Sequence, residues 1–221
     1  MSGVLSRRFW TGRLAARLAR MSNRRGVRWL LRLQDRLAGY TLGVIKLTVG
    51  RSHPKHRVTD LHESERVLDV GCAYGQIANA MAGVAAHVTG VDPRADAIAQ
   101  ARVSHRRDNL EFIVSDLADV PDEPTYDVVV LSNLLEHIRN RTPFLGRCRA
   151  LGPRLLVRVP AIDRDWLVSY RRELGLDWRL HPDHDIEYSE ATLRAELEAA
   201  GFRVDRIWSR FGAVHCVAER A

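Results

Sequence analysis

Short runs of apolar residues recur along the chain at spacings that predict strands separated by helices. A helix is expected to begin at Gln76, an apolar helical stretch surrounds Cys148, and Ser189 can cap a helix that runs from Glu190 to Ala200. The predicted strands cover 67–70, 88–92, 109–116, 126–133, 154–160, 204–208 and 213–218. Strands that alternate with helices predict an α/β fold with a doubly wound sheet, in which ligands bind at the carboxyl ends of the strands.

The segment after the first predicted strand is made of small residues. Gly71, Ala73 and Gly75 stand between that strand and the helix that begins at Gln76. Because such residues put almost no side chain in the way, the backbone can come close to a ligand. The second strand ends at Asp92, one βαβ unit later, where a carboxylate can accept hydrogen bonds from ribose hydroxyls. The two features together predict a nucleoside-containing cofactor.

The spacing of the small residues separates the cofactor classes. A dinucleotide fingerprint, G-x-G-x-x-G, would need glycine at position 76, which is Gln76, whereas this chain reads G-x-A-x-G. With its apolar strand and Asp69, the segment resembles the first motif of the class I S-adenosylmethionine-dependent methyltransferases: an acid followed by G-x-G-x-G. Ala73 departs from that motif by one methyl group, which slightly restricts the closest approach of the cofactor.

The resemblance continues in the order of the family and covers about residues 53 to 219. The stretch Leu134-Leu135-Glu136-His137-Ile138 is similar to the "LEH" stretch of the branch related to ubiquinone-biosynthesis methyltransferases. The resemblance implies a seven-stranded Rossmann-like sheet of order 3-2-1-4-5-7-6. It also implies that the glycine turn holds the methionine part of S-adenosyl-L-methionine, that Asp92 binds the ribose and that Asp116 pairs with the adenine. The cofactor-binding set is then Asp69, Gly71, Cys72, Ala73, Gly75, Asp92, Pro93, Asp116, Leu117 and Asn133.

Length and composition indicate the number of domains and the cellular compartment. A chain of 221 residues can bury a proper core, and one α/β domain of this size is ordinary. Its three cysteines are too few and too far apart for a disulfide framework or a zinc knuckle, which favours a reducing compartment. The sequence has no run of eighteen apolar residues, so no spanning helix is expected. We therefore expect a cytoplasmic protein.

Charge divides the chain in two. Residues 1–57 hold fourteen Arg or Lys against one acid, a net charge of +13, and since the whole chain carries +7 the remainder carries −6. Residues 1–52 have apolar positions at spacings near three and four, which predicts a basic amphipathic helical extension ahead of a methyltransferase domain at 53–221. We favour a lid over the domain, or contact through residues 1–40 with the inner face of an anionic membrane. Nucleic-acid binding and an organellar transit peptide are the less favoured alternatives.

Two further segments are candidates for binding the methyl acceptor. The cationic loop at 50–57 can reach over the cofactor or a negatively charged substrate, or it is a solvated linker. Its "HPKHR" sequence resembles one in bacterial methyltransferases of surface-glycan gene clusters. Residues 161–188 form an insertion beyond the core fold, and in this family such insertions bind the substrate. The residues expected to contact the acceptor are Arg57, Trp166, Tyr170 and Tyr188.

Polar side chains gather near the end of that insertion: His181, Asp183, His184 and Asp185. Two imidazoles and two carboxylates can bind a divalent ion, but Pro182 interrupts any regular spacing, and we predict no metal site there. His184 and Asp185 are instead candidates for acceptor contact, with His184 a general base because its ordinary pKa suits proton removal at neutral pH. His137 can also line the site. The alternative is that these histidines only brace the loop and the neighbouring helix.

These features predict a methyltransferase that acts on an oxygen of a glycan, lipid-linked or small-molecule acceptor. No Asn-Pro-Pro-Tyr motif follows the fourth strand, where Ser132-Asn133-Leu134-Leu135 stands instead, and this argues against methylation of exocyclic base amines. One alternative is an RNA or protein methyltransferase recruited by the basic N-terminus. A different class is a cofactor-binding adaptor that lacks turnover and works through its N-terminal helices.

Overall fold

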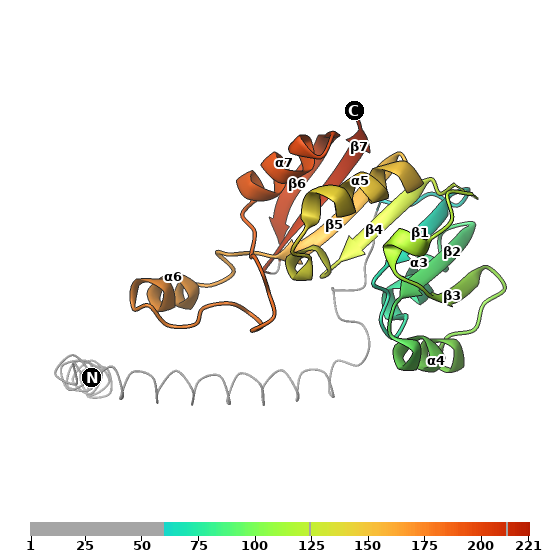
Figure 1. The fold of residues 1–221 in the computed structure, drawn as a ribbon, viewed down its shortest axis with the longest axis horizontal. Coiled ribbons are helices and arrows are strands. Elements are labelled where there is room, and N and C mark those ends of the chain that lie inside the picture. Colours follow the sequence, from blue (N-terminus) through green and yellow to red (C-terminus); the bar gives the residue numbers. More distant parts are fainter. Residues whose placement is uncertain (1–59, 124, 211) are drawn as a thin grey trace, which may run out of the picture. The chain divides into compact units, whose positions relative to one another are not determined.

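The computed structural model describes residues 60–123, 125–210 and 212–221, and in these it contains a seven-stranded sheet. The strands are β1 (Arg66–Val70), β2 (His87–Asp92), β3 (Leu110–Val114), β4 (Val128–Ser132), β5 (Arg154–Pro160), β6 (Phe202–Arg210) and β7 (Ala213–Arg220). Their order is β3-β2-β1-β4-β5-β7-β6 (Figure 1), which confirms the predicted order. Neighbours among β1 to β5 are parallel, and β7 is antiparallel to both β5 and β6.

The apolar runs form the inner strands because both faces of a parallel sheet are covered. Val128 to Leu131 of β4 are all at most 3% exposed, and the Val67–Val70 run of β1 is buried as well. The edge strand β3 differs, since its Ile113 and Val114 are exposed. Continuous apolar runs are typical of parallel strands that are buried on both faces. The burial of β1 and β4 therefore explains the apolar runs from which these strands were predicted.

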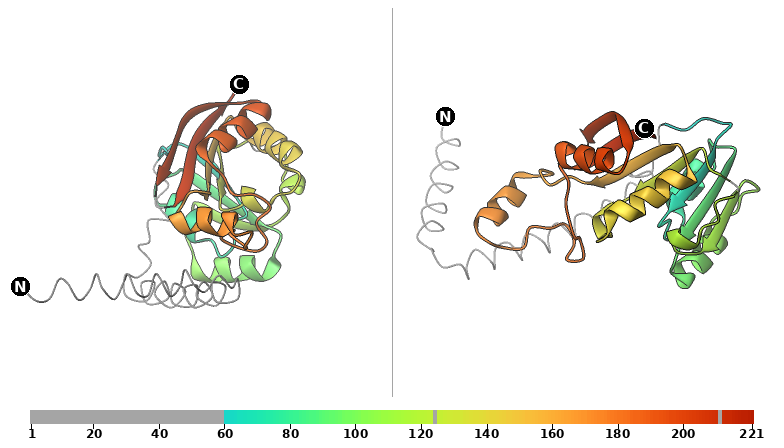
Figure 2. Two further views of the ribbon diagram at one scale, coloured as in Figure 1. Left: turned by 90° about the vertical axis from the view of Figure 1, so that its left-hand side faces the viewer. Right: turned by 45° about the horizontal axis from the view of Figure 1, so that its top comes forward.

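Helices cover both faces of the sheet (Figures 1 and 2). They are α3 (Gln76–Met81), α4 (Ala95–Ser104), α5 (Arg141–Leu151) and α7 (Glu190–Ala199), whereas α6 (Trp166–Glu173) belongs to the predicted insertion. Apolar residues of α3 and α4 belong to one core cluster, and those of α5 and α7 belong to the other. Cys72, Cys148 and Cys216 are all free and buried in these clusters.

The helix predicted from Ser189 is confirmed as α7. The Ser189 hydroxyl accepts a hydrogen bond from the Thr192 amide, and the Ser189 amide donates one to the Thr192 hydroxyl, which completes a capping box. Gly201, with φ 84°, follows the helix and leads into β6. The predicted insertion at 161–188 begins and ends at the same place, because an isolated parallel bridge joins Ala161 to Tyr188. The insertion contains α6, which lies apart from the sheet in both figures.

The predicted helical extension at 1–52 and the cationic loop at 50–57, with Arg57, lie outside the described residues. Among the residues that the structure does describe, no helix has the length and apolar character needed to cross a membrane.

Candidate active site

The first turn of the site joins β1 to α3 and has an unusual backbone. Gly71, Ala73 and Gly75 lie in the left-handed region, with φ values of 69°, 49° and 76°. The amides of Gly71 and Cys72 both donate to the carbonyl of Val91, at 2.8 and 3.0 Å. These bonds attach the turn to the end of β2, so the two predicted cofactor elements form one continuous surface at the carboxyl edge of the sheet.

Glycine is required near this turn for packing as well as for conformation. A Cβ atom at Gly75 would lie 2.5 Å from Cζ of Phe112, on the edge strand β3. A Cβ atom at Gly90, in the middle of β2, would lie 2.9 Å from Cδ1 of the same ring. No role was predicted for Gly90, although a glycine inside a strand is a signal of close approach. The Phe112 ring therefore occupies space that any side chain at either glycine would need.

Asp92 ends β2 and holds the turn from the other side. Its carboxylate accepts hydrogen bonds from the Ala73 amide at 2.9 Å and from the Arg94 amide at 3.0 Å. The Arg94 guanidinium also forms an ion pair with it at 3.1 Å. Burial by itself would raise the pKa of Asp92, but the hydrogen bonds from Arg94 and Ala73 outweigh it and lower the pKa. Asp92 is thus a fixed, ionised acceptor at the carboxyl end of β2.

Asp69 lies within β1, beside the turn, and is only 2% exposed. One carboxylate oxygen, Oδ2, has no hydrogen-bond partner among the described residues. Burial raises the pKa of Asp69 to about 7, against a hydrogen bond from the backbone of Ala78, and the nearby charge of Asp92 raises it further. A buried acceptor without a donor is costly, so this oxygen is suited to a polar or cationic ligand.

The remaining predicted cofactor residues follow β2 and β3. Pro93 is exposed between β2 and α4. Asp116 caps the short 3-10 helix η2 (Leu117–Asp119), where its carboxylate accepts a hydrogen bond of 3.4 Å from the amide of Ala118. Leu117 is buried in the core beneath it. The Asp116 carboxylate thus stands just beyond the end of β3, at the same edge of the sheet as Asp92.

A second turn follows β4 and packs against the first. Asn133 has a positive φ of 53°, and its side-chain oxygen accepts a hydrogen bond of 3.0 Å from the guanidinium of Arg158 on β5. A Cβ atom at Gly71 would lie 2.9 Å from Cδ1 of Leu134. The two turns are therefore in direct contact, and the absence of a side chain at Gly71 makes room for the second one.

The second turn continues as the 3-10 helix η3 (Leu135–His137), which carries a buried carboxylate. Glu136 is 0% exposed, and neither of its carboxylate oxygens has a hydrogen-bond partner in the described part of the chain. Burial raises its pKa to about 7, although the positive charge of Arg158 opposes this. No role was predicted for Glu136, even though it stands at the centre of the "LEH" stretch.

Two imidazoles complete this cluster. The rings of His137 and His184 lie edge to face with their centroids 4.7 Å apart. One donor atom each from Glu136, His137 and His184 can be chosen so that all three lie within 4.8 Å of one another. The structure therefore brings together two of the residues predicted to be catalytic, His137 and His184, across 47 positions of sequence, and adds a carboxylate to them.

Comparison with known proteins identifies the family. The model of the methyltransferase domain family matches residues 8–207, which is most of the chain. The chain belongs to this family and is a class I S-adenosylmethionine-dependent methyltransferase. A ubiquinone biosynthesis O-methyltransferase from Rhodopseudomonas palustris (strain HaA2) is 30% identical over 138 residues, 60% of this chain and 54% of that protein. A probable S-adenosylmethionine-dependent methyltransferase from Mycolicibacterium smegmatis is 32% identical over 141 residues, 63% of this chain and 52% of the other.

The methyltransferase thus spans about half the length of the curated relatives it matches. Among solved structures, magnesium protoporphyrin IX methyltransferase from Synechocystis PCC 6803, with bound S-adenosylhomocysteine, superposes with a TM-score of 0.58 at 21% identity. That superposition covers 72% of this chain and 75% of the other, and it supports the fold.

The residues of the first turn fit the family's cofactor. S-adenosylmethionine carries a cationic ammonium group, and the unpartnered oxygen of Asp69 offers it a buried acceptor. Gly71 and Gly75 give the turn its left-handed backbone, and Asp92 presents an ionised carboxylate beside it. Ala73 keeps the left-handed backbone of the motif despite its methyl group, so its departure from glycine leaves the shape of the turn intact.

Two residues predicted to act in the methyltransferase are engaged in structural contacts. Asp185 forms an ion pair with Arg141 at 3.2 Å, and its amide donates to the carbonyl of Glu136 at 2.8 Å. Tyr188 was predicted to contact the acceptor, but it is completely buried, and its hydroxyl donates to Glu196 on α7 at 2.6 Å. We assign Tyr188 a packing role, since the core surrounds its ring. Trp166 and Tyr170 belong to α6, and their side chains lie outside what the structure describes.

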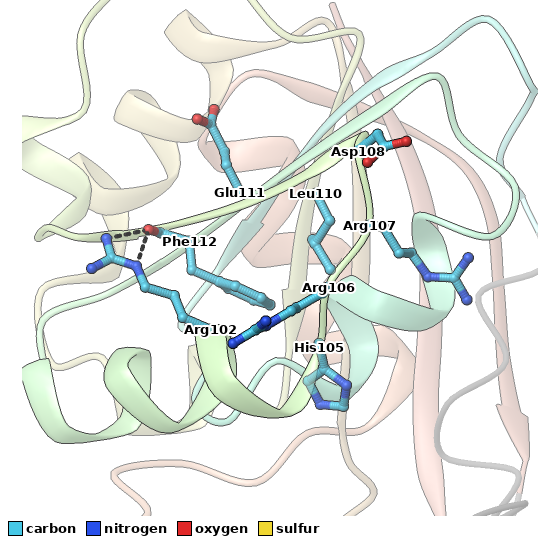
Figure 3. A pocket seen from close by; sticks show the side chains of 8 residues that line it. All are labelled: Arg102, His105, Arg106, Arg107, Asp108, Leu110, Glu111 and Phe112. Atoms are coloured by element: carbon cyan, nitrogen blue, oxygen red, sulfur yellow. Dashed lines mark hydrogen bonds between the residues drawn. The ribbon is translucent and has the colours of Figure 1, made fainter.

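A surface hollow of about 440 Å³ lies beside α4 and β3 (Figure 3). It is lined by residues of α4, of the loop after it and of β3: Arg102, His105, Arg106, Arg107, Asp108, Leu110, Glu111 and Phe112. Leu110 begins β3, so the hollow opens at the amino end of that strand, whereas the predicted cofactor residues are at the carboxyl ends. Arg102 is already bound there, because its guanidinium donates to the carbonyl of Phe112. We assign this hollow no part in methyl transfer.

Proposed function

We propose that this methyltransferase transfers a methyl group to a hydroxyl oxygen of a small-molecule, glycan or lipid-linked acceptor. The observation that carries the proposal is the pair of imidazoles, His137 and His184, beside the turn after β4, whose Leu134 contacts Gly71 of the cofactor turn. A hydroxyl must lose its proton as it is methylated, and the site offers groups that can take it. The name of the Rhodopseudomonas relative, an O-methyltransferase, supports the same choice.

The cofactor residues have separate roles in this proposal. Asp69 binds the ammonium group of the methionine part, Asp92 the ribose hydroxyls and Asp116 the adenine. The turn from Gly71 to Gly75 lies against the methionine part, and Asn133 is beside the sulfonium. The carboxylate of Asp92 accepts only from Ala73 and Arg94 among the described residues, and since a carboxylate has about four acceptor sites, it keeps capacity for a ribose hydroxyl.

S-adenosylmethionine supplies a methyl group that its sulfonium has already activated. The acceptor oxygen forms a bond to the methyl carbon while the carbon–sulfur bond breaks, and the electron pair of that bond stays on sulfur. Holding the two reactants in line can lower the barrier by about 7–11 kcal/mol, so positioning is the main task of the site. The proton of the acceptor hydroxyl passes to an imidazole.

His184 is suited to receive that proton. It is 7% exposed, and burial lowers its pKa below the ordinary value of 6.5, with the neighbouring His137 lowering it further and Glu187 opposing. His184 is therefore neutral near pH 7 and can act as a base. Asp185, paired with Arg141, then helps to hold the loop that carries His184.

The test is methyl transfer to a matched series of aromatic acceptors that carry a hydroxyl, an amine or only hydrogen at one position. Transfer is followed by mass spectrometry of the acceptor. We expect the hydroxyl member to be methylated, and Asp92→Ala to abolish transfer together with S-adenosylmethionine binding in calorimetry. His184→Gln should lower kcat at least tenfold with little change in cofactor affinity, because general bases contribute about 10²–10⁴-fold.

His87→Gln is the matched control, because His87 also faces a carboxylate, Glu111, at 3.3 Å, but at the start of β2. It should leave transfer unchanged. Methylation of the amine alone would contradict the proposal. Cofactor binding without transfer to any member of a broad acceptor panel would instead favour the adaptor alternative. Transfer to RNA or protein that depends on residues 1–52, which lie outside the described residues, would favour the recruited methyltransferase.

A further inference from the structure

We propose that Glu136, His137 and His184 bind one divalent first-row transition-metal ion. The three side chains supply two imidazole nitrogens and one carboxylate, with donor atoms within 4.8 Å of one another. This inference goes beyond the proposed function and changes one step of it. An imidazole nitrogen that binds the ion cannot also accept the acceptor's proton, so with an ion bound the acceptor hydroxyl would lose its proton to solvent. It also differs from the sequence-based expectation, which considered only donors from 181–185 and predicted no metal site.

The first argument is the state of Glu136. Its side chain is completely buried, yet both carboxylate oxygens are without a hydrogen-bond partner among the described residues. Arg158 acts on it only through its charge, while that guanidinium hydrogen-bonds Asn133. Buried charged groups in proteins are paired, hydrogen-bonded or bound to metals. A cation held by these two oxygens would supply the partner that the described residues do not provide.

The second argument is the orientation of the two imidazoles. Nδ1 of His137 lies 3.3 Å from a carboxylate oxygen of Asp183, and Nδ1 of His184 lies 3.3 Å from one of Glu187. In each ring the Nδ1 nitrogen therefore faces a carboxylate, and with that contact kept the Nε2 nitrogen would be the ligand atom. A carboxylate behind a histidine is the usual outer arrangement of metal sites, where it fixes the tautomer and makes the ligand more basic.

The third argument is that the outer carboxylate at His184 is itself firmly held. Glu187 is 3% exposed, forms an ion pair with Arg164 and accepts a hydrogen bond from the amide of Leu180. The loop is also attached to η3, because the amide of Asp185 donates to the carbonyl of Glu136. The insertion thus presents His184 to Glu136 through contacts that need no ion, so the site is preformed.

The donor set selects the class of ion. Two imidazoles and one carboxylate are ligands that Zn²⁺, Mn²⁺ and Fe²⁺ use in open sites, and they leave coordination positions for other oxygens. Mg²⁺ prefers oxygen ligands and is the expected weak binder. The His137 side chain is 33% exposed, so the cluster is accessible from one side. An acceptor hydroxyl bound at an open position would lose its proton more easily, because a divalent ion lowers the pKa of a coordinated oxygen.

The experiment uses the full chain, freed of any tag and dialysed against a chelator. It is titrated with Zn²⁺, Mn²⁺ and Mg²⁺ in separate calorimetric runs, and with Co²⁺ followed by its visible absorption. We expect Zn²⁺ or Mn²⁺ to bind at one high-affinity site per chain, more tightly than Mg²⁺, with a Co²⁺ spectrum that the same ions abolish. Glu136→Gln keeps the shape of the side chain, and it should weaken binding at least tenfold, as should His184→Ala.

His87→Ala is the matched control, because it removes an imidazole that lies 3.3 Å from Glu111 at the other end of the sheet. Its affinity should equal that of the unaltered protein. Glu187→Gln should weaken binding about 10–100-fold through the position and basicity of His184. The proposal fails if the folded protein binds no ion, if Glu136→Gln binds as tightly as the unaltered chain, or if Mg²⁺ binds most tightly. Because the readout is metal binding, an ion that binds without any transfer to hydroxyls would contradict the proposed function alone.

Discussion

The two turns that meet at the carboxyl edge of the sheet are built in opposite ways. The turn after β1 is local, since its glycines, Ala73 and the carboxylate of Asp92 come from one βαβ unit and are joined by backbone hydrogen bonds. The turn after β4 becomes a site only when the insertion brings His184 next to Glu136. The first is thus specified by backbone conformation and the second by side chains distant in sequence. At each turn a buried carboxylate oxygen has no hydrogen-bond partner among the described residues, and this is where we expect ligands.

The largest expected effect comes from filling the space at the first turn. Gly75→Ala should lower the free energy of unfolding by about 2–5 kcal/mol, because the added methyl group meets both a positive φ and the Phe112 ring. Gly175 also has a positive φ, 63°, but open space around it, so Gly175→Ala reports the conformational cost alone. Gly146 lies inside α5 with nothing near it, and Gly146→Ala should stabilise by about 0.5–1 kcal/mol.

Chemical denaturation of the three variants measures these differences. If Gly75→Ala costs no more than Gly175→Ala, the Phe112 contact does not constrain the turn, and the contrast drawn between the two turns weakens.

The next effect concerns the unpartnered carboxylate of the first turn and depends on pH. The pKa of Asp69 is raised to about 7 in the folded protein, from 3.8. Between these values the folded state holds a proton that the unfolded state has released, so the free energy of unfolding falls as pH rises toward 7 and is level above it. Asp69→Asn removes this penalty and should be the more stable protein at pH 8, by about 2–4 kcal/mol in the absence of cofactor.

Denaturation curves at pH 5 and pH 8 give the comparison, since the advantage of Asp69→Asn should be smaller at pH 5. The same variant should bind S-adenosylmethionine more weakly, because the buried acceptor has lost its charge. Equal stability of the two proteins at both pH values would contradict the raised pKa.

A smaller effect sharpens the description of the second region. Tyr188→Phe removes the hydrogen bond to Glu196 and should lower the free energy of unfolding by about 1 kcal/mol. Glu196 keeps its ion pair with Arg141, so its charge is not left unpaired. Because we assign Tyr188 to the core, KM for the acceptor should not change. A large increase in KM with unaltered stability would return Tyr188 to the acceptor site.

The smallest effect tests the one departure from the motif of the first turn. Ala73→Gly removes the methyl group from a residue with φ 49°, which relieves the strain but gives the unfolded chain more freedom. We expect a change of less than about 1 kcal/mol in stability, and a cofactor affinity equal to or slightly tighter than that of the unaltered protein in calorimetry. A marked loss of affinity would mean that the methyl group itself contacts the cofactor.

Most of the fold was predictable from sequence because its signals are local. The apolar runs, the small residues after β1 and the cap at Ser189 each act on their own segment. The order of the strands came from the resemblance to the family, and the structure has the same order. The division of the chain at residue 52 stays a prediction, since the residues before it lie outside the described part.

The cofactor turn could be predicted from the sequence, whereas the cluster of Glu136, His137 and His184 could not. The sequence by itself determined the positions of Gly71, Gly75 and Asp92, because a strand, a tight turn and a following acid are set by neighbouring residues. Only the tertiary structure decided that Glu136 is buried with no hydrogen-bond partner in the described part of the chain, and that His184 lies beside it with Glu187 behind the ring. Burial and the meeting of segments about 50 positions apart depend on how the insertion packs against η3. No periodicity or spacing along the chain records that contact.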